Sequence, residues 1–449
     1  MNNKKLTVML ALISTVIVAI WAWSYAMNAT ASTHLPWITY HNILYVTGLL
    51  AMALLSITMI LATRPAILEP VFNGLDKIYR LHKWTAILAV IFAVLHWLTE
   101  MNDDLLESLL LVSGQPTEAS VSGFVDTMQE LAEDLGEWSF YLVAGMVLLS
   151  LLKFFPYKFW RYLHRIMPVL YLLLVFHAAW LTPFSWWQQP IGLLLGLLMV
   201  AGSIAAMRSL TGHIGRTRRV QGTIKSITAS AQGITQVVCQ LGKKWPGHRA
   251  GQFAFVRFDR LEGNHPFTIA NADKNNGQLT FEIKALGDYT KNLAGKITEG
   301  QAVTVEGPYG RFDLKHHKAN AEQIWVAAGI GVTPFLAWLE ELQNHPEQVP
   351  TAQMHYCTHD GSSDPMVPRL QQLCDNLKSD NSPGISLHIH DSQKGQKITT
   401  EDLLNRDAAK KVTEVWYCGP KGLARLLETG LKKMLPGSLR FRKEAFEFR

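Results

Sequence analysis

Four histidines in two apolar segments of the N-terminal half form two pairs matched by depth. His82 and His96 lie 14 residues apart, and His164 and His177 lie 13 apart, which is roughly 21 and 20 Å along a helix. If the two segments lie side by side and run in the same direction, His82 comes level with His164 and His96 with His177. Each pair then offers two imidazoles to one iron, so we expect two haems, one near each membrane face.

In a regular helix, His164 and His177 of the second segment would not both face the first segment. At about 100° per residue, a separation of 14 residues returns to nearly the same face, whereas 13 does not. Pro168 lies between His164 and His177, and proline removes a backbone hydrogen bond and can kink a helix. We predict that it restores the facing. A shared zinc ion is excluded, because the two depths are about 20 Å apart.

Three motifs in the polar half carry groups that suit a flavin dinucleotide. In chain order they begin at His265 (HPFT), Ile283 (IKALGDYT) and Gly307 (GPYGR). Such a ligand needs cations and donors at its pyrophosphate and a shaped wall at its ring. Positive charge and hydroxyl donors come from His265, Lys284, Thr268 and Thr290, and Gly287 allows close backbone approach. The ordered set predicts an FAD site, although each motif alone is ordinary.

Two further motifs end predicted strands. In the first, 327–334 (AAGIGVTP), Gly329 and Gly331 let backbone amides approach a phosphate at a helix start. In the second, 417–420 (YCGP), the turn lies where a ligand crevice is expected in a parallel sheet. Cys418 then lies either beside a nicotinamide or as a buried structural thiol.

Six apolar segments of bilayer length occupy the first half of the chain. We predict spans at residues 6–27, 41–63, 81–99, 137–155, 159–181 and 190–208, the first of them uncleaved. Lysines and arginines gather before the first span, after the second, around the turn between the fourth and fifth, and after the sixth. All these segments fall on one side, which the positive-inside rule makes cytoplasmic. We expect a multi-pass protein of the plasma (bacterial inner) membrane with both termini cytoplasmic.

The polar half changes pattern part-way. Short alternating stretches at 223–228, 234–241, 252–258, 279–285 and 302–306 predict an antiparallel β-barrel. Stretches at 323–328, 353–358, 385–390 and 415–418 predict a parallel sheet with helices between its strands. The expected fold is a six-helix α transmembrane bundle (1–212), a β-barrel FAD domain (216–316) and an α/β Rossmann-like NAD(P)-binding domain (320–449).

Composition excludes several other functions. The formal net charge over the 449 residues is +6, and the sequence has no basic stripe with interleaved aromatics. Nucleic acid is therefore not an expected partner. Membrane lipid is an expected partner, because many of the cations lie next to apolar segments. The four cysteines all lie in the polar half and include no CxxC pair, which argues against a disulfide framework and an iron–sulfur cluster. They are Cys239, Cys357, Cys374 and Cys418.

Together these residues resemble the ferric reductase / NADPH oxidase superfamily of transmembrane flavocytochromes, over nearly the whole chain. The resemblance implies that His82, His164, His96 and His177 ligate two b-type haems. It assigns FAD to His265, Pro266, Phe267 and Thr268, and to Lys284, Gly287 and Thr290. It assigns NAD(P)H to Gly329, Gly331, Thr333 and Pro334, and to Cys418, Gly419 and Pro420. It also implies an aromatic residue near the C-terminus against the flavin ring, for which Phe446 is the candidate and Phe448 the fallback.

The chain departs from that pattern in one place. A basic residue after strand 353–358 would help to hold a 2′-phosphate, but His359 and Asp360 follow. The nucleotide is therefore left open between NADPH and NADH.

The implied function is an oxidoreductase that passes electrons from cytoplasmic NAD(P)H through FAD and two haems to an acceptor outside. That acceptor is dioxygen, giving superoxide, or a ferric chelate; an extracytoplasmic protein or a quinone is the alternative. A reading of another class is a membrane transporter that uses its histidines for protons or metal, with a nucleotide-sensing soluble half.

Overall fold

The computed structural model describes most of the chain. The described residues are 3–27, 35–72, 74–102, 123–152, 155, 157–230, 232–259, 262–287, 289–316, 321–378, 384–404 and 413–444. The chain forms two compact units, residues 1–214 and 215–448. Each unit has hydrophobic clusters of its own.

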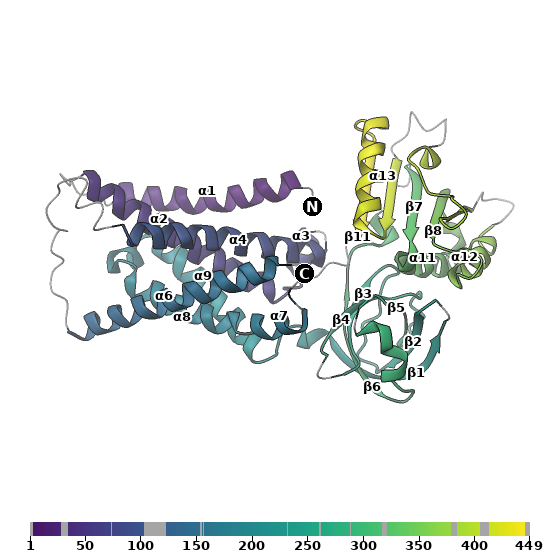
Figure 1. The fold of residues 1–449 in the computed structure, drawn as a ribbon, viewed down its shortest axis with the longest axis horizontal. Helices are drawn as coiled ribbons and strands as arrows, with labels where there is room; N and C mark the ends of the chain where they lie inside the picture. Colours follow the sequence, from purple (N-terminus) through teal and green to yellow (C-terminus); the bar gives the residue numbers. More distant parts are fainter. Residues whose placement is uncertain are drawn as a thin grey trace. The chain divides into compact units, whose positions relative to one another are not determined.

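The first unit contains six helices that are long and apolar enough to cross a membrane, counted over the described residues. Figure 1 shows long helices of this unit running side by side. They are α1 (Asn3–Met27), α2 (Leu35–Ala62), α4 (Leu75–Glu100), α6 (Gly123–Leu151), the pair α7 (Tyr157–His164) and α8 (Met167–Leu181), and α9 (Pro190–Leu210). A short helix, α3 (Leu68–Phe72), precedes α4, and a 3-10 turn, η1 (Phe184–Gln188), precedes α9.

The six predicted spans are confirmed as helices, but four of them have different limits. Helices α2 and α4 each begin six residues before the predicted start, at Leu35 and Leu75, and α6 begins fourteen residues before it, at Gly123, because each helix extends beyond the apolar run that a hydropathy pattern counts. The fifth span is broken between His164 and Met167, with Pro168 in the first turn of α8. Proline is tolerated there because the first turn needs no N–H donor.

The helices of this unit are apolar on more than one side. Helix α9 buries Ile191, Leu195 and Met199 against its neighbours, yet Leu193 and Leu197 on its other face are well exposed. A helix that is apolar around its whole circumference is typical of a membrane span, since its outer face meets hydrocarbon rather than water.

The second unit begins with a six-stranded antiparallel sheet in the order β4-β3-β6-β1-β2-β5. Its strands are β1 (Arg219–Ala229), β2 (Ile234–Leu241), β3 (Phe253–Arg257), β4 (His265–Thr268), β5 (Gln278–Lys284) and β6 (Ala302–Tyr309). A bridge between Ile269 and Phe281 joins the two edge strands, so the sheet closes almost completely. Its inner face buries a continuous apolar cluster that includes Val237, Val256 and Phe281. The predicted barrel is confirmed.

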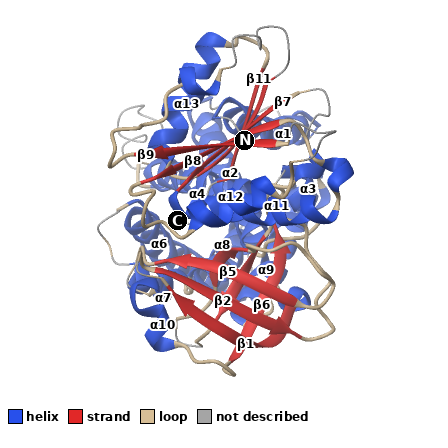
Figure 2. Cartoon of the chain, turned by 90° about the vertical axis from the view of Figure 1, so that its right-hand side faces the viewer, coloured by secondary structure: helices blue, strands red, loops and turns tan. Residues whose placement is uncertain are grey.

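A five-stranded parallel sheet follows in the order β11-β10-β7-β8-β9. Its strands are β7 (Glu322–Ala328), β8 (Ala352–Thr358), β9 (Ile385–Asp391), β10 (Thr413–Cys418) and β11 (Leu439–Glu444), with helices α11 (Thr333–Asn344), α12 (Met366–Asp375) and α13 (Lys421–Met434). Figure 2 shows this sheet as a layer separate from the barrel strands. Strand β11 was not predicted, because its sequence LRFRKE is too charged to read as a buried strand.

Strand order determines where a ligand can bind in the parallel sheet. The chain runs from β7 outward through β8 to β9 and then returns to place β10 on the other side of β7. The order therefore reverses between β7 and β10, and ligands of open parallel sheets bind outside the carboxyl ends of strands at such a point. Both glycine motifs, after Ala328 and after Cys418, follow these two strands.

Candidate cofactor-binding sites

Helices α4 and α8, with the short α7, bring the four membrane histidines together in pairs. The ring centres of His82 and His164 lie 6.3 Å apart, with an angle of 77° between the ring planes. The ring centres of His96 and His177 also lie 6.3 Å apart, at 88°. The break before Pro168 supplies the change of phase that a continuous helix would lack.

Backbone carbonyls orient three of these four imidazoles. The Nδ1–H of His82 donates to the carbonyl of Thr58, that of His96 to Leu44 and that of His177 to Ala132, each at 2.9 Å. A ring that donates from Nδ1 keeps the lone pair of Nε2 available. Histidines that ligate metals characteristically hold their second nitrogen in this way, because it fixes the tautomer and the ring orientation.

The spacing of each pair suits an iron between two imidazoles. A metal midway between two coaxial rings lies about 2 Å from each ligand nitrogen, and each nitrogen lies about 1.2 Å from its ring centre, which puts the centres about 6.4 Å apart. Both observed separations are 6.3 Å. Within the described residues no group of three or more metal-ligating side chains occurs. Two imidazoles at this spacing fit haem, which takes two axial ligands from the protein.

His164 is held differently from its three counterparts. Its ring stacks on Trp160, one turn earlier in α7, with ring centres 4.8 Å apart and 22° between the planes. Its Nδ1 is buried and has no hydrogen-bond partner within the part of the chain that the structure describes. Aromatic stacking thus takes the orienting role that carbonyls have at the other three positions.

The first flavin motif lies on the barrel edge strand β4. His265, Pro266, Phe267 and Thr268 pair with β3, opposite Val256 through Phe253. The imidazole of His265 stacks on Tyr289, with ring centres 4.3 Å apart and only 6° between the planes. The sequence motif contained Tyr289, but its role as the ring that joins the first flavin motif to the second was missed.

The second flavin motif forms a tight turn after β5. The Thr290 hydroxyl accepts hydrogen bonds from the backbone N–H groups of Leu286 and Gly287, both at 3.0 Å. The hydroxyl therefore stabilises the turn itself, a local role typical of threonine. Gly307 of β6 packs against Ala254, where an added Cβ would lie 3.2 Å from the alanine Cβ.

The nucleotide loop follows β7 as a single 3-10 turn, Gly329–Val332, that leads into α11. Gly329 has φ +54, and Thr333 closes the turn through its hydroxyl, which donates to the carbonyl of Ile330 at 2.6 Å. Pro334 lies in the first turn of α11. Lys284 of the flavin motif reaches this loop, since its Nζ lies 3.8 Å from where a Cβ on Gly329 would be. The Lys284 ammonium group therefore lies close to the N-terminus of α11.

The loops after β7 and β10 fit together at the point where the strand order reverses. A Cβ on Gly331 would overlap the Cys418 carbonyl, and one on Gly419 would lie 2.8 Å from the Cβ of Ala328. Pro420 precedes α13, and its carbonyl accepts the Tyr417 hydroxyl at 2.7 Å. Only glycine allows this approach of the two backbones.

The Cys418 side chain is fully buried. Burial, with a smaller contribution from Glu444, raises the pKa of its thiol well above the ordinary value. The thiol therefore stays protonated and is no nucleophile. The candidate flavin-facing aromatics, Phe446 and Phe448, lie outside the described residues.

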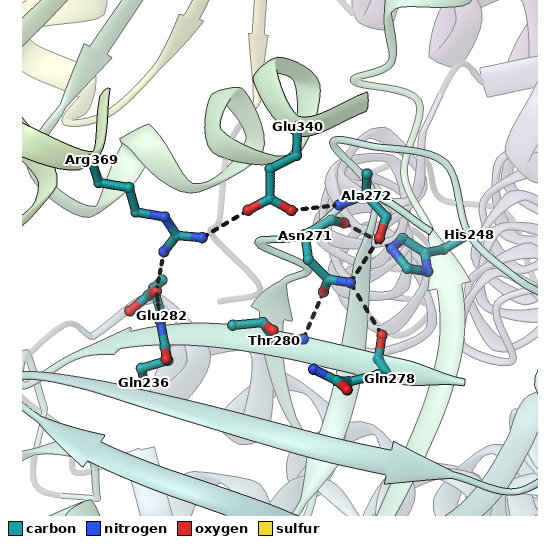
Figure 3. A network of polar contacts seen from close by, with 9 residues as sticks. All are labelled: Gln236, His248, Asn271, Ala272, Gln278, Thr280, Glu282, Glu340 and Arg369. Atoms are coloured by element: carbon teal, nitrogen blue, oxygen red, sulfur yellow. Dashed lines mark hydrogen bonds and ion pairs between the residues drawn. The ribbon is translucent and has the colours of Figure 1, made fainter. Parts of the chain in front are cut away.

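A polar network holds the barrel against the nucleotide-binding part of the second unit (Figure 3). Arg369 of α12 donates to Glu282 of β5 at 2.7 Å and to Glu340 of α11 at 3.0 Å. Glu340 in turn accepts the N–H of Ala272, and Gln236 also donates to Glu282. The network connects β2 and β5 of the barrel with both helices, so it fixes the flavin motifs relative to the nucleotide loop.

Two domain families match the chain in the order that the structure displays. Residues 47–175 match the ferric reductase like transmembrane component, and residues 221–313 match the FAD-binding domain. The fold and these matches define a class of membrane protein in which a helical transmembrane domain is joined to a flavin-binding reductase module. The chain is similar to NADPH oxidases, and it carries a ferric reductase like transmembrane segment followed by an FAD-binding segment.

Proteins similar to this chain include animal and plant oxidases. Dual oxidase 2 of Rattus norvegicus is 26% identical over 60% of this chain and 18% of its own length. Respiratory burst oxidase homolog protein E of Arabidopsis thaliana is 26% identical over 42% of this chain and 22% of its own. The chain thus spans about a fifth of the length of these relatives.

Two further similarities involve an electron transfer subunit and a solved structure. The electron transfer subunit of dihydroorotate dehydrogenase B (NAD(+)) from Shouchella clausii is 41% identical over 19% of this chain and 34% of its own length. Among solved structures, flavohemoglobin from Malassezia yamatoensis with bound FAD and heme has a TM-score of 0.48 at 14% identity, covering 90% of this chain and 98% of that one.

Proposed function

We propose that this protein moves electrons across a membrane, from NAD(P)H through FAD and two b-type haems to an acceptor on the extracytoplasmic side. The observation that carries the proposal is the double pairing of His82 with His164 and of His96 with His177 at one metal-spanning distance. The pairs occur in the same chain as an FAD-binding domain. The oxidase names of the rat and Arabidopsis relatives support the same class of reaction.

In the membrane unit, the four histidines supply the axial ligands. The carbonyl bonds at Leu44, Thr58 and Ala132 hold Nδ1 protonated and leave Nε2 for the iron. When bound, FAD turns a two-electron donor into a source of single electrons, and the haems carry those electrons through a layer that excludes ions.

In the reductase module, the flavin motifs on β4 and after β5 hold FAD. His265 and Lys284 would supply positive charge to its pyrophosphate, Thr290 closes the turn after β5, and Gly287 gives the room for backbone approach. Pro266, Phe267, Thr268 and Gly307 shape the barrel wall.

The nucleotide binds at the carboxyl ends of β7 and β10. Gly329, Gly331 and Thr333 present the N-terminus of α11 to its phosphates, with Pro334 fixing the first turn. Cys418, Gly419 and Pro420 form the wall beside the nicotinamide. Cys418 acts there through its backbone and shape, since its buried thiol stays protonated.

The spans and their flanking cations support a plasma (bacterial inner) membrane location with both termini cytoplasmic. Arg64, Lys77, Arg80 and Lys83 follow the second span, and Arg208 ends the sixth. These cations, with those before the first span, lie on one side of the predicted topology. The reductase module then faces the cytoplasmic pool of nucleotide.

The acceptor is dioxygen, reduced by one electron to superoxide, or a ferric chelate, reduced by one electron to the ferrous form. Anaerobic protein is first reduced by NAD(P)H, and its haem absorbance is then followed on adding oxygen or a ferric chelate. Rapid reoxidation by the chelate alone assigns ferric reduction, and rapid reoxidation by oxygen with superoxide release assigns the oxidase. Slow reoxidation by both favours an extracytoplasmic protein or a quinone.

Absorption spectra test the proposal against the transporter hypothesis. Purified protein is expected to show flavin absorption together with the split bands of low-spin bis-imidazole haem, and NAD(P)H should reduce that haem. Protein that carries FAD but no haem after expression in a haem-replete host would contradict the proposal and favour a transporter with a nucleotide-sensing half.

A further inference from the structure

Three of the four membrane histidines bind carbonyls that already serve their own helix. In an α-helix the carbonyl of residue i accepts the N–H of residue i+4. The carbonyls of Leu44 and Thr58 lie inside α2, and that of Ala132 lies inside α6. Each therefore uses its second lone pair for an imidazole of a neighbouring helix. Such a bond requires the ring to lie directly against the helix surface.

At two of the three contacts the residue four positions after the carbonyl is a glycine, whereas Ala62 holds that position after Thr58. Gly48 follows Leu44 at this spacing, and Gly136 follows Ala132. A Cβ on Gly48 would lie 2.9 Å from Cε1 of His96 and 3.0 Å from its Nδ1. A Cβ on Gly136 would overlap the His177 ring, with 2.6 Å to Cε1 and 2.7 Å to Cγ. At both glycines the imidazole ring therefore occupies the space where a Cβ would lie.

Gly48 and Gly136 differ from Gly145, another glycine of α6. Gly145 of α6 has nothing within 4 Å of the place where its Cβ would be, taking the described residues as the surroundings. Glycine destabilises a helix relative to alanine, so a packing reason is expected where it occurs inside one. At Gly48 and Gly136 that reason is a histidine ring.

We propose that Gly48 and Gly136 are positioning residues for the outer histidine pair. They admit the rings of His96 and His177 to the carbonyls of Leu44 and Ala132, which fixes both tautomers and aims both Nε2 atoms at one iron. The two glycines lie on different helices, α2 and α6, and act on opposite members of the pair. The inference rests on the proposed function, since it requires haem between these histidines.

The test uses the full-length protein in detergent with three matched variants, Gly48→Ala, Gly136→Ala and the control Gly145→Ala. Haem and FAD per polypeptide are measured for each, together with the electron paramagnetic resonance spectrum of the oxidised protein. The overlap at Gly136 is the more severe, so Gly136→Ala should lower haem from two per polypeptide toward one while FAD stays unchanged. Gly48→Ala should retain more haem but shift the low-spin g-values of one of the two centres. Gly145→Ala should match the wild type.

The outcomes separate this inference from the proposed function. Wild-type protein without haem would contradict the proposed function itself. Wild-type protein with two haems, and unchanged haem content and g-values in both Gly48→Ala and Gly136→Ala, would overturn only the positioning role. If Gly136→Ala cannot be purified with FAD, Gly48→Ala decides alone, because its milder overlap can be relieved by a small movement of the ring. An effect of Gly145→Ala equal to that of Gly136→Ala would also overturn the inference, since it would show a general intolerance of α6.

Discussion

Arg369 of α12 donates to Glu282 of β5 at 2.7 Å, and this contact joins the nucleotide-binding part of the second unit to the flavin barrel (Figure 3). Glu282 is almost fully buried, whereas the arginine side chain is 27% exposed. A buried carboxylate needs a partner, because an unpaired charge in the interior is costly. Arg369 therefore neutralises a barrel residue from outside the barrel.

Replacing this arginine should loosen the reductase module. Arg369→Ala leaves Glu282 with only the amide of Gln236, and we expect the free energy of unfolding to fall by about 2 kcal/mol. For a unit of this size that corresponds to a drop of roughly 5 °C in the temperature at which bound FAD is released. Flavin fluorescence during heating measures it. Arg425→Ala on the exposed face of α13 is the control, and an equal release temperature in both variants would contradict the bridging role.

Removing one outer histidine should remove one haem and leave the flavin in place. His177→Ala deletes a member of the outer pair, while FAD-binding residues lie in the separate unit 215–448. We expect haem per polypeptide to fall from two toward one, with FAD unchanged and the haem of the His82–His164 pair still reducible by NAD(P)H. His213→Ala, a juxtamembrane histidine outside both pairs, should keep two haems. Full haem content in His177→Ala would refute ligation by this pair.

The sequence predicted which histidines lie at the same depth but not the hydrogen bonds that orient their rings. Nearly equal separations, 14 and 13 residues, indicated which rings lie level, and Pro168 indicated where the phase changes. The carbonyls of Leu44, Thr58 and Ala132 left no such signal, since any residue type supplies a carbonyl. Gly48 and Gly136 become informative only when the helices that face them are known.

In the second unit, alternation predicted the barrel, because a half-buried strand imposes a period of two on its sequence. The succession of strand, glycine turn and helix predicted the parallel sheet, whose central strands are buried on both faces. Strand β11 was not predicted, because its partly exposed edge position allows Arg440 and Arg442 within the strand. The stacking of His265 on Tyr289 was also not predicted, because it joins two motifs that are separate in sequence. Contacts across the fold carry no periodic signal in the chain.

Asp360 should make this protein favour NADH over NADPH. It follows β8, the strand next to the nucleotide loop, and hydrogen bonds from Ser362 and Ser363 lower the pKa of its carboxyl to about 2, so it stays charged at every physiological pH. A fixed negative charge there repels a 2′-phosphate, whereas a carboxylate suits a ribose hydroxyl. Asp360→Ser should raise kcat/KM for NADPH relative to NADH by roughly tenfold. Asp375→Asn, an exposed carboxylate on α12, should leave the ratio unchanged, and a wild-type preference for NADPH would contradict the prediction.

His355 should make the second unit lose stability as pH falls below about 6.5. Burial, followed by the neighbouring His388 and His390, lowers the pKa of its imidazole from 6.5 to about 3, although Asp402 opposes the shift. The Nδ1 of His355 lies 3.0 Å from the Nε2 of His390.

The sign of the effect follows from which state takes up the proton. Below pH 6.5 the unfolded chain protonates His355, but the folded chain does not until about pH 3. Stability due to this residue is therefore constant above pH 6.5 and falls by about 2 kcal/mol between pH 7 and pH 5. His355→Gln keeps a neutral polar group and should flatten that part of the pH dependence, measured as FAD-release temperature from pH 5 to 8. His345→Gln, an exposed histidine after α11, is the control, and equal slopes in His355→Gln and wild type would show that the imidazole is not buried in the neutral form.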